Sequence, residues 1–488
     1  MKNYIGKLSN KKLGIFLTFI FLFTITQQFF FRENHVLLIY GLKDLIYFNN
    51  LKSDWVTDYT NHIPIYTGLT FLLSKFFTVK SLYILYYILL FLCTYSLFTI
   101  FNKNYQFNKS QIILWFLLFI ILFHEKSYFT GVAGQAVINQ TLQPASFGIF
   151  FFISLAFYFH SKIFFSIFFL CIAVYFHPTY LIHSMFFVAG YLVHNFVIKK
   201  NIIFFKIILI YSCLILPVIF FLHHNFIINE ANINLLAQKI LVEERIPHHA
   251  KISHWLSYKD FISIGIIFVG LFLIRNSNFF FIPLTVICIL SLSISLIQYY
   301  TENYFIALLF PWRTSVFLIP ISSLIIISHL VKRINLNIKF ATSLFLIFYL
   351  FFFIKNILVE EKFNKKLNNK NDLFIFLKSN EKIDLLIIPT YMEDIRLNTS
   401  VPIFVNWKLH AFKNNEIIEW HKRIKIVNSF YGSENAHQQL SFLKKINFIQ
   451  GTSHILLDKS KQNTLLINCK IINSSNNYIL YNSNTCKD

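Results

Sequence analysis

Two carboxylates, Asp54 and Asp58, stand four residues apart in the stretch SDWVTDYTNHIP, residues 53–64. On an α-helix this spacing places both side chains on one face, with Ser53 as the N-cap and Pro64 limiting the helix. An aligned pair of this kind can act as a general base, or bind a divalent cation together with a phosphate ligand. The same spacing also fits a solvated polar turn between membrane elements, so the pattern leaves both interpretations open.

A second group of candidate residues lies in EERIPHHAKISHW, residues 243–255. Adjacent side chains on a regular element point apart, so His248 and His249 are not expected to share one metal ion. Arg245 with one of these His residues suits a phosphate or diphosphate group, because the guanidinium has the planar donor geometry. A polar surface loop is the alternative interpretation.

Arg313 stands in FPWRTS, residues 310–315, directly before an apolar run. It would suit the phosphate of a lipid arriving from the bilayer, or would extend to headgroups at the membrane surface. The Gly-containing polar loop 131–144 is predicted on the same face, where it either lines a cavity or connects two spans. The chain has no ATP-binding, dinucleotide-binding or zinc-peptidase motif, so those chemistries have no sequence support.

These candidates belong to a chain of 488 residues that is 56% hydrophobic and 19% aromatic, far outside the composition of soluble domains. Its 44 basic residues exceed its 22 acidic ones and are spread as short clusters between apolar runs. That distribution is typical of loops facing anionic lipid rather than of a nucleic-acid-binding patch. We therefore expect a polytopic α-helical membrane protein embedded in the lipid bilayer, with no nucleic acid as partner.

Apolar runs long enough to cross a hydrocarbon core predict about eleven transmembrane helices. The predicted spans are 13–31, 80–101, 110–124, 144–160, 163–177, 179–198, 203–222, 259–274, 278–298, 314–330 and 336–354. The basic start of the chain and the basic loops FNKNYQFNKS, VIKKNIIFFK and LVKRINLNIK put the N-terminus in the cytoplasm. The outer loops are then 32–79, 125–143, 223–258 and 299–313. Within the first of them, the apolar stretch 63–77 is predicted to lie in the membrane interface.

The composition changes beyond residue 355. Residues 1–355 are predicted as the transmembrane domain with its outer loops, and residues 356–488 as an extracytoplasmic soluble α/β domain large enough to hold a core. There KIDLLIIPTY, SHILLDKS and NYILYNSN have the pattern of strands, and NNEIIEWHKRIKIVNSF has helical spacing. Cys469 and Cys486 can pair in that domain, since an oxidising compartment permits disulfides.

The arrangement resembles the GT-C class of integral-membrane glycosyltransferases, in particular poorly characterised bacterial multispan proteins with a C-terminal soluble domain. The likeness is carried by SDWVTDYTNHIP, YFHPTYLI, ERIPHHAKISHW, FPWRTSVFLIP and EDIRLNTSVPIFVNWKLHAFKNNEIIEWHKR. It implies a GT-C-like fold in the bacterial cytoplasmic (inner) membrane. It also implies transfer of a sugar from a polyprenyl-phosphate-linked donor to a glycan or lipid acceptor on the outer face, in cell-envelope polysaccharide biosynthesis.

Carried onto this sequence, the resemblance makes Asp54 or Asp58 the catalytic base, and assigns Arg313 and the segment 245–249 to the lipid phosphate. The first outer loop has no tight pair of the D-x-D or E-x-D type. The identity of the base and the need for a divalent cation therefore stay open.

A different class of function competes with this one. A flippase or transporter for a lipid-linked saccharide would place ionisable residues along the spans, where His183, His194 and Lys206 are among the few candidates. A polysaccharide polymerase or ligase would also act on lipid-linked glycans from the outer face.

Overall fold

The chain forms two compact units in the computed structural model of residues 1–488, and each unit is described by itself. Unit 1 comprises Met1–Gln27, Tyr83–Phe221 and Leu241–Glu360, and unit 2 comprises Gln28–Leu82, Leu222–Ile240 and Glu361–Asp488. The structure describes residues 8–25, 39–44, 50–51, 54–78, 81–125, 129–138, 142–199, 203–226, 230–378, 383–393, 395–461, 465 and 467–487.

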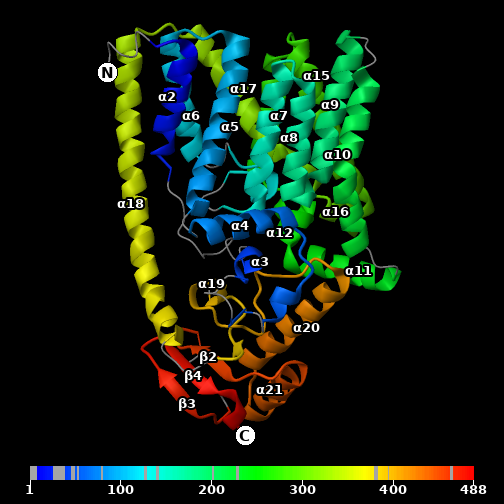
Figure 1. The fold of residues 1–488 in the computed structure, drawn as a ribbon, viewed down its shortest axis with the longest axis vertical. Coiled ribbons are helices and arrows are strands. Elements are labelled where there is room, and N and C mark those ends of the chain that lie inside the picture. Colours follow the sequence, from blue (N-terminus) through cyan, green and yellow to red (C-terminus); the bar gives the residue numbers. More distant parts are fainter. Residues whose placement is uncertain are drawn as a thin grey trace. The chain divides into compact units, whose positions relative to one another are not determined.

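Unit 1 is a bundle of apolar helices (Figure 1). Its longer helices are α2 (Asn10–Leu22), α5 (Ser81–Tyr105), α6 (Lys109–His124), α7 (Ile149–Phe159), α8 (Ile163–Phe176), α9 (Leu181–Lys199), α10 (Ile203–Phe226), α14 (Tyr258–Leu273), α15 (Asn278–Thr301), α17 (Ser315–Arg333) and the first part of α18 (Ile338–Lys378). Each predicted span overlaps one of these helices, although α2 ends at Leu22 and residues 26–31 of the first predicted span lie outside the described residues.

Short helical turns connect the long helices of unit 1. They are η5 (Val132–Gly134), η6 (Pro144–Gly148), η7 (Pro178–Tyr180), the π-helical turn η8 (Ile240–Arg245), α12 (Pro247–Ala250), α13 (Ile252–Trp255), α16 (Tyr304–Leu308) and η9 (Pro311–Thr314). Pro stands at the first position of η6, η7, α12 and η9, where its missing N–H and fixed φ favour a helix start. The candidate residues of unit 1 lie on or beside these turns.

Six helices in the described part of the chain are long and apolar enough to cross a membrane: Ser81–Tyr105, Pro178–Val197, Phe204–Phe226, Phe279–Thr301, Tyr304–Arg333 and Ile338–Lys362. Three shorter apolar helices, Lys109–His124, Pro144–Phe159 and Ile163–Phe176, accompany them. The chain is thus a mostly helical membrane protein. The stretch 63–77, predicted to lie in the interface, forms α4 (Pro64–Phe76) in unit 2, a helix of 13 residues.

Small and hydroxylated side chains pack the helices of unit 1 closely, as is common for helices in membranes. A Cβ on Gly270 of α14 would come within 2.6 Å of Ser322 of α17, so only glycine permits this approach. Ser154 of α7 lies 2.9 Å from Ser166 of α8 and 3.0 Å from the hydroxyl of Tyr191 of α9. Hydrogen bonds of this kind hold neighbouring helices in register without a hydrophobic driving force.

Unit 2 contains a four-stranded sheet in the order β1-β2-β4-β3 (Figure 1). Its strands are β1 (Leu386–Ile387), β2 (His454–Asp458), β3 (Ile471–Ser474) and β4 (Tyr478–Asn482). β1 and β2 are parallel, whereas β4 is antiparallel to both β2 and β3. The sequence prediction of strands β1, β2 and β4 is confirmed. The apolar core of the sheet includes Leu386, Leu456 and Leu480, packed against Leu373 and Leu377 of α18.

The helices of unit 2 come from three separate stretches of the chain. They are α3 (Ile39–Leu42), η3 (Trp55–Asp58), α4, α11 (Ala231–Lys239), the end of α18, α19 (Ile395–Thr399), α20 (Asn414–Tyr431), α21 (Ala436–Ile449) and η10 (Ser483–Thr485). α20, predicted from its helical spacing, packs against α21 and α11. Of the predicted outer loops of the transmembrane domain, 32–79 and the first part of 223–258, up to residue 240, therefore belong to the same unit as the C-terminal residues, whereas residues 241–258 belong to unit 1.

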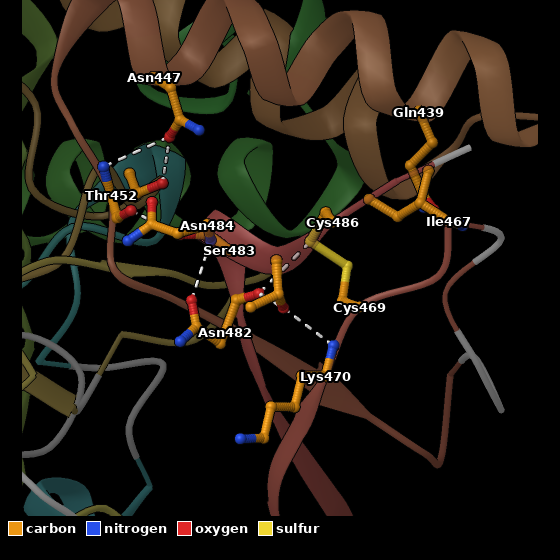
Figure 2. The surroundings of a disulfide bond; sticks show 11 residues. Gln439, Asn447, Thr452, Ile467, Cys469, Lys470, Asn482, Ser483, Asn484 and Cys486 are labelled. Carbon is orange, nitrogen blue, oxygen red and sulfur yellow. Dashed lines mark hydrogen bonds between the residues drawn. A yellow bond between two sulfur atoms is a disulfide. The ribbon is translucent and has the colours of Figure 1, made fainter.

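A disulfide joins Cys469 to Cys486 near the end of unit 2, across a sequence separation of 17 (Figure 2). Backbone hydrogen bonds between Asn468 and Lys487 run beside it. Asn482, at the end of β4, caps η10 by accepting a hydrogen bond from the backbone of Asn484. The pairing considered for these two cysteines is confirmed, and the C-terminus is closed onto the sheet.

Candidate functional site

Asp54 lies at the N-cap of η3 in unit 2, with its side chain accepting a hydrogen bond from the backbone N–H of Val56. The predicted α-helix with Asp54 and Asp58 on one face is wrong, because residues 55–58 form a 3₁₀ turn. Side chains three apart eclipse in that geometry, not side chains four apart. The predicted cap Ser53 lies outside the described residues.

Both carboxylate oxygens of Asp54 are occupied by donors from the C-terminal segment. Arg396 of α19 donates from Nε to Oδ2 at 2.6 Å and from Nη2 to Oδ1 at 3.1 Å, and the backbone N–H of Ile403 donates to Oδ2 at 2.9 Å. Asp54 is 0% exposed and Arg396 3% exposed. With the bond from Val56, this carboxylate accepts four hydrogen bonds, which fills its acceptor capacity.

Two further contacts hold the segment after Asp54 within unit 2. The backbone N–H and the hydroxyl of Thr60 donate to the carboxylate of Glu416 of α20, at 3.1 Å and 2.7 Å. The ring of His62 stacks on Phe412, with the ring centroids 3.6 Å apart. Residues 54–62 are therefore bound into the C-terminal fold by a buried ion pair, a carboxylate and a stacked ring.

Asp58 differs from Asp54 in its exposure to solvent and in its position in the turn. Its side chain is exposed, and it stands at the last position of η3. Beside it, Trp55 packs under the guanidinium of Arg423 at 3.9 Å, and the buried position of Arg423 lowers the pKa of that group. Of the two carboxylates predicted as catalytic, Asp58 is the one that a solvent-borne substrate can reach.

Arg313 of unit 1 is held by uncharged partners. Its Nη1 donates to the hydroxyl of Thr179 at 2.8 Å, its Nε donates to Oε1 of Gln135, and its guanidinium lies 4.8 Å from the ring centre of Phe310. No ion pair with a carboxylate is found for Arg313 among the described residues. A cation in such surroundings is a ready site for an anion, because its charge is not neutralised by the protein.

His183 completes what we call the Arg313 cluster: Arg313, Gln135, Thr179, His183 and Thr314. Nδ1 of His183 lies 2.8 Å from the hydroxyl of Thr314, and that hydroxyl donates to the backbone oxygen of Pro311 at 3.0 Å. The hydroxyl has one hydrogen, so Nδ1 is the protonated nitrogen and Nε2 carries the lone pair. Nε2 of His183 and Nε2 of Gln135 are both buried, and neither has a hydrogen-bond partner among the described atoms.

A short loop places Gln135 beside Arg313. Ser315 accepts from the backbone N–H of Val132 at 2.9 Å, and Asp260 accepts from that of Ala133 at 3.2 Å. Ala133 has a φ of 59°, a left-handed conformation that is uncommon for a residue with a Cβ. Two successive backbone N–H groups of this turn are thus bound by side chains of α17 and α14, two and three residues before the amide that contacts Arg313.

The predicted segment 245–249 lies next to the same loop. Nδ1 of His249 is 3.1 Å from the backbone oxygen of Ala133, and the backbone oxygen of His249 accepts from the indole of Trp312 at 3.0 Å. His248 and His249 have ring centroids 4.1 Å apart, and Arg245 is 8% exposed. The structure therefore links His249 to the surroundings of Arg313 through Trp312, which directly precedes Arg313, and through Ala133, which lies two residues before Gln135. Arg245 is buried at the end of the preceding turn η8.

Sequence reasoning did not single out Gln135, Thr179 or Arg396 as functional residues. Gln135 lies in the polar loop 131–144 and Thr179 in the stretch YFHPTYLI, and neither residue carries a charge that would mark it. Arg396 stands between Ile395 and Leu397, but acidic residues precede these three and polar residues follow them in EDIRLNTS, so no local signal marks Arg396 as the partner of a buried carboxylate. No group of three or more His, Cys, Asp or Glu that could hold a metal ion occurs in the described part of the chain.

Comparison with known proteins adds one match. The family described as a domain of unknown function, DUF6798, matches residues 377–427. This segment contains Arg396, Phe412, Glu416 and Arg423, the side chains that contact residues 54–62. No curated protein matches the chain.

Proposed function

We propose that this protein is a membrane glycosyltransferase of the GT-C type, with about eleven spans, that uses a polyprenyl-phosphate-linked sugar as donor on the outer face of the membrane. The observation that carries the proposal is the Arg313 cluster in unit 1. Its chemistry fits a ligand that has a phosphate group and a hydroxyl close together.

The hydrogen-bond capacity of the cluster defines this ligand. The guanidinium of Arg313 and the amide Nε2 of Gln135 offer donors, which a phosphate oxygen accepts. Nε2 of His183 offers a lone pair, which a hydroxyl satisfies by donating to it. A phosphate ester of a sugar presents both partners, since its phosphate oxygens accept from Arg313 and Gln135 and a sugar hydroxyl donates to the imidazole.

Asp58, rather than Asp54, is the proposed general base for the acceptor hydroxyl. A general base must accept a proton from a substrate within hydrogen-bond reach. Asp54 has four donors on its two oxygens and is 0% exposed, so its proposed part is to hold residues 54–62 in unit 2. Asp58 is exposed and four residues along the same segment.

The Cys469–Cys486 disulfide supports the proposed location of unit 2 outside the cytoplasm, because structural disulfides persist in oxidising compartments. The proposed topology is a multi-pass protein of a bacterial inner membrane, with the N-terminus in the cytoplasm and unit 2 outside it.

The test of the donor site uses the full chain in lipid nanodiscs and a fluorescent polyprenyl-phosphate hexose as the probe. Arg313→Gln removes charge-assisted hydrogen bonds worth about 1.5–3 kcal/mol, so the dissociation constant should rise by about tenfold to a hundredfold. Arg275→Gln is the matched control, because Arg275 also lies over a phenylalanine ring, at 4.0 Å, but on the exposed surface. Equal binding by the wild-type protein and Arg313→Gln would remove the donor site from the proposal.

A lipid-linked saccharide flippase is the second candidate function. It is favoured by a buried imidazole in unit 1, that of His194 on α9, whose Nδ1 contacts the hydroxyl of Tyr158 on α7. Ionisable side chains within membrane helices often mark a substrate path. In proteoliposomes, a flippase moves the fluorescent lipid between leaflets without consuming it. A transferase instead releases polyprenyl phosphate when the acceptor is supplied, and Asp58→Asn should abolish that release.

A further inference from the structure

Unit 2 contains a cavity of about 340 Å³ at the carboxyl ends of its two parallel strands. Tyr391 lines it from the loop after β1, Asp458 from the end of β2, and Tyr431 and Gly432 from the end of α20. In α/β sheets, ligands bind in the crevice outside the carboxyl ends of the strands. Small-molecule sites typically have volumes of roughly 300–1,000 Å³, so the cavity is large enough for one small ligand.

Each hydroxyl group that lines the cavity already donates its hydrogen in a hydrogen bond within unit 2. Tyr391 donates to Oδ2 of Asp458 at 2.8 Å, Tyr431 donates to a backbone oxygen at 2.7 Å, and Ser433 donates to a backbone oxygen at 2.8 Å. A hydroxyl has one hydrogen and two lone pairs, so these three groups can only accept further hydrogen bonds. The polar lining therefore fits a ligand that carries several donors.

The lining of the cavity contains one acidic and one basic side chain, so it favours neither an anion nor a cation by its net charge. Asp458 is 9% exposed and supplies one negative charge, and Lys461 supplies one positive charge. A phosphate would be attracted by Lys461 and repelled by Asp458, and an amine the reverse, so each would have one favourable and one unfavourable contact. A neutral ligand with hydroxyl groups can hydrogen-bond to both side chains without a repulsive contact.

The cavity also offers an aromatic surface to a ligand. Tyr391 is 50% exposed, so one part of its ring faces solvent at the edge of the cavity. An aromatic ring offers a rigid apolar face beside its polar hydroxyl. A ligand with both an apolar C–H face and hydroxyl groups is a saccharide ring.

We propose that this cavity binds a neutral saccharide unit, with Tyr391 contacting the apolar face of the sugar ring and Asp458 accepting a hydrogen bond from one of its hydroxyl groups. The proposal concerns unit 2 alone and does not depend on the Arg313 cluster of unit 1. The same residues would serve a free sugar or one unit of a longer glycan.

Saturation-transfer difference NMR on the full chain in nanodiscs tests the proposal, with glucose, galactose, mannose and N-acetylglucosamine as the probes. We expect transfer to at least one of these sugars, and about tenfold weaker binding to Tyr391→Ala, in line with the loss of an aromatic contact and its buried area. Phe448→Ala is the control, because Phe448 lies on α21 outside the cavity and is 93% exposed. Arg313→Gln separates this site from the proposed donor site.

Each outcome of this experiment either supports or overturns the proposal. Weaker binding by Tyr391→Ala, with Phe448→Ala and Arg313→Gln unchanged, supports the cavity as a saccharide site whether or not the proposed transferase function holds. Absence of transfer to all four sugars overturns the proposal, and so does binding that only Arg313→Gln weakens. Asp458→Asn is the second variant: it keeps the shape of the side chain but removes a charged acceptor, and undiminished binding by both this variant and Tyr391→Ala would also overturn the proposal.

Discussion

The ion pair between Asp54 and Arg396 gives the sharpest prediction for unit 2. Asp54→Ala would leave the guanidinium of Arg396, which is 3% exposed, without its counter-ion, and the backbone N–H of Ile403 without an acceptor. Removing one partner of a buried pair typically costs about 3–5 kcal/mol, since the remaining charge stays buried and uncompensated. For a unit of this size, each kcal/mol lowers the melting temperature by about 2–4 °C. The expected loss is therefore about 6–20 °C.

The measurement is hydrogen exchange of the full chain in nanodiscs, followed by mass spectrometry across a temperature series. Peptides from 386–403 and 454–458 report on the sheet of unit 2, while peptides from α9 and α17 report on unit 1. In Asp54→Ala the sheet peptides should lose protection at a lower temperature, whereas the peptides of unit 1 should stay unchanged.

Two variants distinguish this reasoning from a general effect of substitution near Asp54. Asp58→Asn changes an exposed carboxylate in the same turn, so it should alter stability by less than about 0.5 kcal/mol. The double variant Asp54→Leu with Arg396→Met removes both charges and should regain part of the stability lost in Asp54→Ala. If Asp54→Ala and Asp58→Asn lower the melting temperature equally, the ion pair does not hold the loop and the reasoning is refuted.

Three other predictions follow from buried groups. Burial lowers the pKa of His62 to about 3, so below about pH 6.5 the folded state binds fewer protons than the unfolded state. Unit 2 should therefore lose about 2 kcal/mol of stability between pH 7 and pH 5. Denaturation midpoints should show this loss in the wild-type protein but not in His62→Phe, and an equal loss in both would contradict the prediction. Replacing Cys469 and Cys486 with Ser opens a loop with a sequence separation of 17, and this should lower the free energy of unfolding by about 3 kcal/mol. The urea midpoint of the variant should be lower than that of the oxidised protein, and reductant should no longer change it. A variant as stable as the oxidised protein would show that the disulfide does not stabilise unit 2. A Cβ on Gly131 would lie 2.6 Å from a serine hydroxyl and 2.7 Å from a backbone nitrogen of α17, whereas a Cβ on Gly265 would meet nothing within 4 Å. Gly131→Ala should therefore weaken binding of the polyprenyl-phosphate hexose, and Gly265→Ala should leave it unchanged. The reverse order would disprove the role of the loop that carries Gln135.

The length and periodicity of apolar runs were enough to locate the helices of unit 1. Each predicted span overlaps a helix because a membrane helix satisfies its own backbone hydrogen bonds and needs little more than apolar residues. The strands β1, β2 and β4 and the helix α20 were likewise predicted, since their patterns of apolar residues are local. The predicted helix around Asp54 failed because its turn is held by donors more than three hundred residues away in the chain, and no local pattern contains them.

The sequence by itself determined that this is a helical membrane protein with a mixed α/β segment at its end, and it identified Asp54, Asp58 and Arg313 as candidates. Only the tertiary structure decided what each candidate contacts. It paired Asp54 with Arg396 and left Asp58 exposed, and it surrounded Arg313 with the neutral side chains of Gln135 and Thr179. The physical reason is that apolar burial depends on composition and periodicity along the chain, whereas the chemistry of a charged group depends on which distant donors and acceptors the fold brings within about 3 Å.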